Sequence, residues 1–213
     1  MVKEADALAH VGYEVIVIGQ YWHLWASVAD KSLLPTKKWK YIEVGGSPAG
    51  GRLTYALTRL IHKIGREIQE KVSLKAGIAE LSMSRCGNLL YWEAVRQQAD
   101  LYIGHNPGGL APAINAAKRL GVKCGFDAED FHRREYSDDP NHPDVQRKVF
   151  LEEKYFPLAD YLTTSSPLIT EEYRKVFPDL HFTTILNVFP KTKELVVRPS
   201  QNGSPLRMFW FSQ

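Results

Sequence analysis

Cysteine is scarce in this sequence, and its scarcity excludes several classes of protein. Only two of the 213 residues are cysteine, Cys86 and Cys124, and each stands alone in its segment. This number and spacing fit neither a disulfide framework nor a cysteine-based zinc site. So few cysteines are typical of a reducing compartment, and we therefore expect a cytoplasmic protein.

Long apolar runs and a strong excess of one charge are also missing. No apolar run approaches the roughly 20 residues that a membrane-spanning helix needs, and we expect no signal peptide because the first residues lack that pattern. The net charge is +3, which is only mildly basic and does not call for a nucleic-acid partner. A hydrophobic content of 44% and a charged content of 24% are ordinary for a globular domain.

The most informative stretch covers residues 99–135 and has the pattern of two strands joined by a helix. Residues 101–104 form a short apolar run, which predicts a buried strand that stops at the proline- and glycine-containing turn 105–109. Apolar residues then recur at helical spacing over residues 110–120, and residues 123–126 predict the next strand. This order predicts one strand–helix–strand unit.

Both predicted strands end in polar, titratable side chains. Two strands joined by a helix should be parallel, so their carboxyl ends should meet at one edge of the sheet. In open α/β sheets that edge is where ligands bind. We therefore expect a shared crevice lined by six residues: His105, Asn106, Asp127, Glu129, Asp130 and His132.

Two segments before this unit raise the question of a membrane-facing surface. Residues 53–72 predict a long amphipathic helix with a basic opposite face, and residues 20–40 mix tryptophans and lysines without a clear period. Basic amphipathic helices with nearby tryptophans suit anionic lipid surfaces. The apolar stripe is no wider than a core-facing helix needs, so we favour a helix packed on the sheet over peripheral membrane contact.

Several segments together resemble the N-terminal half of a retaining GT-B glycosyltransferase, of the large group that uses nucleotide-sugar donors. The resemblance covers nearly the whole chain in six weakly specific pieces that follow the order of the family. The pieces are VKEADALAHVGYEVIVIG, ADLYIGHN, AINAAKRLGVKCGFDAEDFH, ADYLTTSSPLITEEY, TTILNVFP and LRMFWFSQ. The resemblance implies an α/β fold with a Rossmann-like, doubly wound, mostly parallel sheet flanked by helices.

The same resemblance predicts how the chain is divided. Residues 1–190 would form the Rossmann-like N-terminal domain, residues 191–205 an interdomain linker, and residues 206–213 the start of a C-terminal domain. The first strand of the family, the loop after it and nearly all of the donor-binding domain have no counterpart here. We therefore expect an acceptor-side half that is inactive alone.

The resemblance also assigns roles to residues. It places His105 in the cleft as the catalytic residue, where a neutral imidazole would suit an acceptor hydroxyl. Asn106, the Asp127–His132 cluster and Asn187, which precedes Val188-Phe189-Pro190, would bind the acceptor or order the cleft. The implied acceptor is a sugar or a lipid-linked molecule, the donor a nucleotide sugar held by the other domain, and no cofactor or metal is implied for this chain.

Simpler interpretations stand beside these roles. Arg133 and Arg134 could pair with the acidic cluster and leave only a salt-bridged loop, and a metal held by Asp127, Glu129 and His132 is the least favoured alternative. The glycines at 104, 108 and 109 fit no phosphate-binding fingerprint and are better explained as turn residues. Two further functions remain open: a nucleotide- or dinucleotide-binding Rossmann enzyme, and a non-catalytic interaction module derived from a transferase half.

Overall fold

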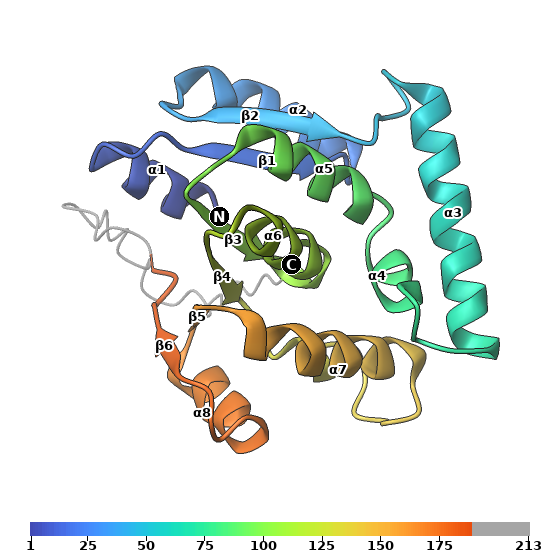
Figure 1. Cartoon of the computed structure of the whole chain (residues 1–213). Coiled ribbons are helices and arrows are strands. Elements are labelled where there is room, and N and C mark those ends of the chain that lie inside the picture. The colour runs from blue at the N-terminus through green and yellow to red at the C-terminus, as the bar shows by residue number, and fades with distance from the viewer. Residues whose placement is uncertain (189–213) are drawn as a thin grey trace, which may run out of the picture.

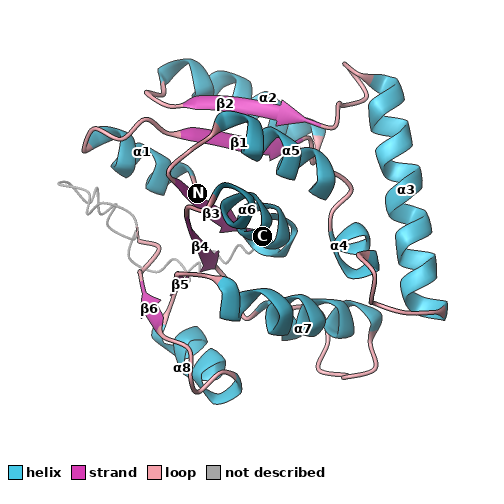
Figure 2. Cartoon of the chain, viewed as in Figure 1, coloured by secondary structure: helices cyan, strands magenta, loops and turns pink. Residues whose placement is uncertain are grey.

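The computed structural model describes residues 1–188, which form an α/β structure with two parallel sheets flanked by helices (Figures 1 and 2). The smaller sheet pairs β1 with β2, and the larger has the order β3-β4-β5-β6. All pairs of neighbouring strands are parallel. The strands are β1 (Ile16–Gln20), β2 (Lys40–Val44), β3 (Leu101–His105), β4 (Lys123–Ala128), β5 (Tyr161–Thr164) and β6 (Phe182–Thr184). The predicted fold class is confirmed.

Helices connect the strands and cover the sheets. They are α1 (Val2–His10), α2 (Leu24–Leu33), α3 (Arg52–Lys71), α4 (Ile78–Met83), α5 (Gly87–Gln97), α6 (Asn106–Leu120), α7 (Pro143–Tyr155) and α8 (Pro167–Val176). Periodicity predicted α3 and most of α6, and Ser166 caps α8, its hydroxyl accepting from the Ile169 N–H at 3.3 Å. Helix α2 was missed because its sequence has no clear apolar period.

The start of α6 differs from the prediction. We expected a loop over residues 105–109, but the helix already begins at Asn106, with Pro107 in its first turn. Proline is well placed there because the backbone N–H groups of a first helical turn have no partner within the helix, so the N–H that proline lacks is not needed. Gly108 and Gly109 are therefore helical residues and not turn residues. Gly109 brings the helix close to β3, since a methyl group on Gly104 would lie 2.9 Å from the Gly109 carbonyl oxygen.

We expected the apolar side of α3 to pack on the sheet, but in the structure the apolar side is exposed. The residues that α3 buries are Thr58, Gly65 and Gln69. Its apolar residues face outward, and Leu53 is 88% exposed. In Figure 1 this helix runs along the outer right side of the molecule and does not cover either sheet. The amphipathic pattern was read correctly, but its apolar side is not the packed side.

The main core lies between the larger sheet and its helices and is rich in aromatic rings. Phe156 is fully buried, and its ring centroid lies 5.4 Å from those of Phe126, Tyr173 and Phe177. Tyr173 stacks on Phe182 of β6 at 5.4 Å. Such aromatic pairs add to the large apolar area that each ring removes from water. This core holds the strands whose carboxyl ends carry the polar residues.

A small second core joins α1 to the smaller sheet. It consists of Ala5, Val17 and Trp39, and the indole N–H of Trp39 donates to Asp6 of α1 at 2.8 Å. Trp39 is therefore a core residue and does not belong to a lipid-facing surface. The hydrogen bond to Asp6 satisfies the indole N–H, as a buried tryptophan requires.

Two of the predicted units lie outside the described residues. These are the linker at residues 191–205 and the segment 206–213, so the domain division stays a prediction there. Within residues 1–188, no helix is long and apolar enough to cross a membrane.

The close approach of α6 to β3 predicts the effect of one substitution. Replacing Gly104 with alanine should lower the free energy of unfolding by about 1–3 kcal/mol, because the added methyl group meets the backbone of Gly109 and cannot be accommodated by a side-chain shift. Denaturant unfolding measures the difference. Gly50→Ala is the matched control, since a methyl group there meets nothing within 4 Å. Equal stability of Gly104→Ala and wild type would contradict the packing described.

Candidate functional site at the carboxyl edge of the larger sheet

The register of the larger sheet brings the predicted residues together. His105, the last residue of β3, pairs with Asp127 of β4, and Asp127 pairs in turn with Thr163 of β5. The Thr163 hydroxyl donates to Asp127 Oδ1 at 2.7 Å, which holds this carboxylate in place. Three neighbouring strands therefore build this edge.

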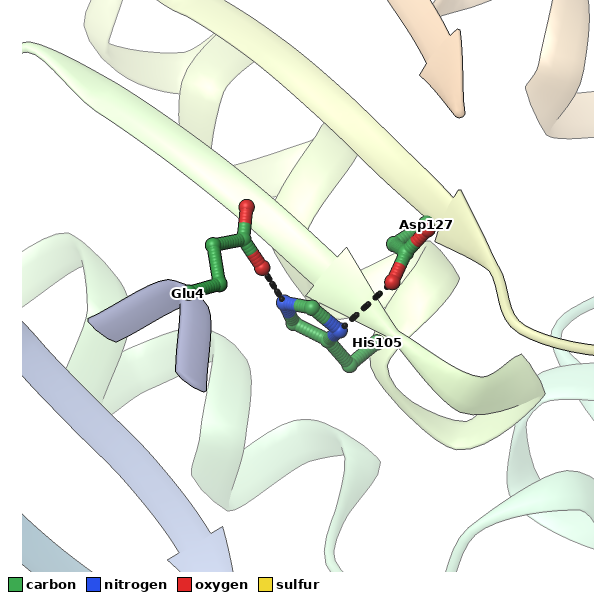
Figure 3. Close-up of side chains that lie close together, drawn as sticks. All are labelled: Glu4, His105 and Asp127. Carbon is green, nitrogen blue, oxygen red and sulfur yellow. Dashed lines mark ion pairs between the residues drawn. The ribbon is translucent and has the colours of Figure 1, made fainter. Parts of the chain in front are cut away.

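His105 lies among three carboxylates, two of which, Glu4 and Asp127, are drawn in Figure 3. Its Nε2 is 2.7 Å from Glu4 Oε2, and its Nδ1 is 3.4 Å from Asp127 Oδ2 and 3.5 Å from Glu129 Oε1. The histidine side chain is 11% exposed, so water screens these contacts only partly. Both ring nitrogens face negative oxygens, and only the doubly protonated ring can donate to both sides.

These contacts determine the charge of the site. Burial lowers the pKa of His105, but hydrogen bonds with Asp127, Glu129 and Glu4 outweigh it and raise that pKa to about 10. Burial raises the pKa of Asp127, but hydrogen bonds with His105 and Thr163 lower it by more. The pKa of Asp127 therefore lies below its usual value. The hydrogen bond from His105 also lowers the pKa of Glu129. The site is thus an imidazolium among carboxylates and not the neutral imidazole that we expected.

Helix α1 supplies the residue that sequence reasoning missed. Glu4 comes from the first turn of α1, far from β3 in the sequence, yet it makes the shortest ion pair with His105. Its neighbour Lys3 donates to Asn187 Oδ1 at 3.0 Å, on the exposed segment after β6. Asn187 is therefore tied to α1 beside the site. No signal in the sequence pointed to Glu4, because a glutamate in a first helical turn is commonplace.

Asn106 forms the corner between β3 and α6. Its φ of +59° lies in the left-handed region, which asparagine tolerates better than most residues. Its side chain is exposed, and no side chain caps the first turn of α6. Unusual backbone at such a corner is common near functional sites. Asn106 thus lies next to His105 at the edge, as predicted.

Asp130 and His132 are placed differently from the acidic residues before them. His132 is 1% exposed, its ring lies 6.3 Å from that of Phe126, and its backbone N–H donates to the Tyr173 hydroxyl. It belongs to the core, so its predicted place in the crevice is wrong. The Asp130 carbonyl oxygen accepts from the same tyrosine hydroxyl, while its side chain is exposed. The chain turns inward after Glu129 because Phe131 and His132 join the aromatic core.

The two arginines after this cluster lie differently, since Arg133 is buried and Arg134 is exposed. Arg133 Nε donates to Glu152 at 2.7 Å, and Tyr173 donates to the same carboxylate at 3.0 Å. Arg133 therefore does not neutralise Asp127 or Glu129, as the simpler salt-bridge interpretation required. Asp127 instead pairs with His105, and Glu129 lies 3.5 Å from His105 Nδ1 and 3.4 Å from the amino group of Met1.

Two groups of described residues bring possible metal ligands together. Glu4, His105 and Asp127 form one group, and Asp130, His132 and Glu135 form the other. A protonated His105 has no free lone pair for a metal. In the second group, Lys148 Nζ lies 2.9 Å from Glu135 and already supplies positive charge. The least favoured alternative, a metal held by Asp127, Glu129 and His132, is not among these groups.

A hollow in the described part of the chain lies elsewhere. It has a volume of about 550 Å³ and lies beside the carboxyl end of β2, between α3 and α5. Its walls are mainly apolar, with Trp92, Leu89 and Val95 among them.

Comparison with known proteins adds no family to this geometry. No protein-family model matches the chain, and no curated protein matches it.

The carboxylates around His105 predict an unusual titration. The His105 ring should remain protonated at pH 8, where an ordinary histidine is neutral, and should lose its proton only near pH 10. Because the folded pKa is raised, the stabilisation from this cluster is fully present below about pH 6.5 and is lost as the pH rises through about 10. Histidine-selective NMR over this pH range measures the midpoint.

Two variants test whether the neighbouring carboxylates cause the raised pKa of His105. Asp127→Asn and Glu4→Gln should each lower the His105 midpoint by about one pH unit or more, because each removes a charge within ion-pair distance. Asp138→Asn, at an exposed loop position, serves as the control and should leave the midpoint unchanged. A wild-type midpoint near pH 6.5 would contradict the arrangement.

Proposed function

We propose that this chain is the acceptor-binding half of a glycosyltransferase that transfers a sugar from a nucleotide-sugar donor to an acceptor hydroxyl with retention of configuration. The observation that carries the proposal is the convergence of His105, Asp127 and Glu129 at the carboxyl edge of a parallel sheet. This edge is the usual ligand-binding position of open α/β sheets. The resemblance of six segments to the GT-B family supplies the reaction class.

The charges of the site suit a ligand rich in hydroxyl groups. Ionised carboxylates only accept hydrogen bonds, and sugar hydroxyls donate them. The lowered pKa values of Asp127 and Glu129 keep both groups ionised near neutral pH. His105 would be the catalytic residue of the complete enzyme. It would donate to an acceptor oxygen that takes the place of Glu4 at Nε2, and in doing so would position the attacking hydroxyl.

The rest of the reaction would belong to another domain. In the complete enzyme the acceptor hydroxyl would attack the anomeric carbon of the donor, the bond from that carbon to the nucleotide diphosphate would break, and the hydroxyl proton would leave with the diphosphate. Basic groups and helix N-termini of the donor-binding domain would stabilise the charge of the leaving group. This chain would then carry acceptor recognition without a nucleotide site, and we expect it to be inactive alone.

Calorimetric titration with nucleotides separates this proposal from its main alternative. The purified chain should bind none of UDP, GDP, ADP or their sugar conjugates, because the donor site would lie in the other domain. Tight binding of any one of them would favour a nucleotide-binding Rossmann enzyme instead. Titration of wild type with inorganic phosphate is the control for weak anion binding at the uncapped start of α6.

The acceptor side is tested by NMR titration with simple sugars. Methyl glycosides of glucose, galactose, mannose and N-acetylglucosamine should shift signals of Asp127, Glu129 and His105, with affinities in the millimolar range that is typical of a few hydroxyl contacts. Asp127→Asn should weaken the response several-fold, whereas Asp138→Asn should not. Shifts restricted to other parts of the molecule would contradict the proposed site.

A further inference from the structure

A stripe of apolar side chains lies exposed on α3, and further apolar side chains lie exposed at and just before the start of α2. We call them together the α2–α3 apolar surface. Its members are Trp22, Leu24, Trp25, Val28, Leu53, Leu57, Leu60, Ile61, Ile64 and Val72. Trp22 is 80% exposed and Leu57 is 57% exposed. Single exposed apolar residues are ordinary on a protein surface, but a stripe such as that on α3 indicates an interaction site.

The polar side of α3 holds the helix in this orientation. His62 Nδ1 lies 2.9 Å from the Leu81 carbonyl oxygen. Gln69 donates to the Pro143 carbonyl oxygen at 2.6 Å and accepts from Arg147 at 2.8 Å. A methyl group on Gly65 would lie 3.0 Å from Leu81, so the helix is closely packed on this side. Rolling the apolar side inward would break these polar contacts.

Contacts in the first half of α3 tie it to the segment just before α2. Arg85 donates to the Tyr21 carbonyl oxygen at 3.0 Å and to the Thr58 hydroxyl at 2.9 Å. The rings of Tyr21 and Tyr55 meet edge to face at 5.8 Å. Trp22 directly follows Tyr21, so the exposed tryptophans are anchored beside the first half of α3.

Positive charge borders the apolar stripe. At 100° per residue, Arg59, Lys63 and Arg66 fall together on the flank of α3 that lies between the packed side and the apolar stripe. Over its length the helix carries five basic residues and two acidic ones, Glu67 and Glu70, and Glu67 pairs with Lys71 at 2.9 Å. A shallow depression of about 330 Å³, lined by Leu60, Ile64, Ile68 and Val72 among others, follows the second half of the stripe.

We propose that the α2–α3 apolar surface binds an anionic lipid surface, with α3 lying in the plane of the membrane interface. A helix with leucine and isoleucine on one side and basic residues on the other has the character of an interfacial helix. Exposed tryptophans also prefer the interface between membrane and water. Twenty residues at 1.5 Å each give α3 a length of about 30 Å, enough for an extended contact.

Charge favours lipid over a second copy of the chain. In a symmetric dimer the same surface meets itself, so Arg59, Lys63 and Arg66 of both copies would approach one another. Such like charges oppose association, whereas anionic headgroups attract each of them. This proposal does not rest on the proposed function, because none of its residues belongs to the His105 site. If both hold, the acceptor class is a lipid-linked one.

Flotation with lipid vesicles tests the proposal on the full chain. Wild type should float with vesicles of phosphatidylcholine mixed with phosphatidylglycerol and much less with phosphatidylcholine alone, and added salt should weaken the binding. The double variant Leu57→Glu and Ile64→Glu should lose at least about ten-fold in binding, since burying one leucine-sized side chain is worth roughly that factor. The variant should fold normally because both side chains are exposed.

Leu168→Glu is the matched control, because Leu168 is 73% exposed on α8, away from the surface. It should bind vesicles as wild type does. A second readout is tryptophan emission, which should shift to the blue with anionic vesicles in wild type and lose much of that shift in Trp22→Ala with Trp25→Ala.

Three results would overturn the proposal. One is the absence of binding to anionic vesicles by the wild-type chain. Another is equal binding by the Leu57→Glu and Ile64→Glu double variant. The third is a concentration-dependent dimer in size-exclusion chromatography that this double variant abolishes, which would make a second copy the occupant. None of these results bears on sugar binding at His105, so the two proposals fail separately.

Discussion

The pairing of β3 with β4 is the constraint on which the candidate site depends. It sets His105 opposite Asp127, and parallel strands present both side chains at the same edge. The pairing in turn depends on α6 lying close against β3, where Gly104 and Gly109 leave room for backbone contact. The charge of the site follows from this geometry, because an imidazole among three carboxylates is held as the cation.

The larger sheet and α3 illustrate two different uses of apolar side chains. Around Phe156 and Tyr173, apolar rings are removed from water and hold the strands together. On α3 the apolar side chains stay in water, and the polar residues Thr58, His62 and Gln69 make the packed side. Burial of apolar area stabilises a fold, whereas an exposed stripe leaves that free energy to be gained on binding. The two regions therefore carry separate functions in our proposals.

Much of the fold could be predicted from local pattern, and the failures have identifiable causes. Apolar runs located β3 and β4 closely, and helical spacing located α3 and most of α6. The start of α6 was placed late because proline and glycine usually end regular structure, although both fit a first helical turn. Convergence of His105 and Asp127 was predictable from strand order, but the burial of His132 depended on Phe126 and Tyr173, which are distant in sequence.

By itself the sequence determined the class of fold, the positions of most elements and the edge where polar residues gather. These properties depend on periodicity and strand order, which are local and repeat along the chain. Only the tertiary structure decided that Glu4 completes the site, that His105 is charged and that α3 turns its apolar side outward. Each of these depends on which side chains from distant segments meet. The periodicity of a helix or strand shows which residues share a face, but not which part of the protein that face packs against.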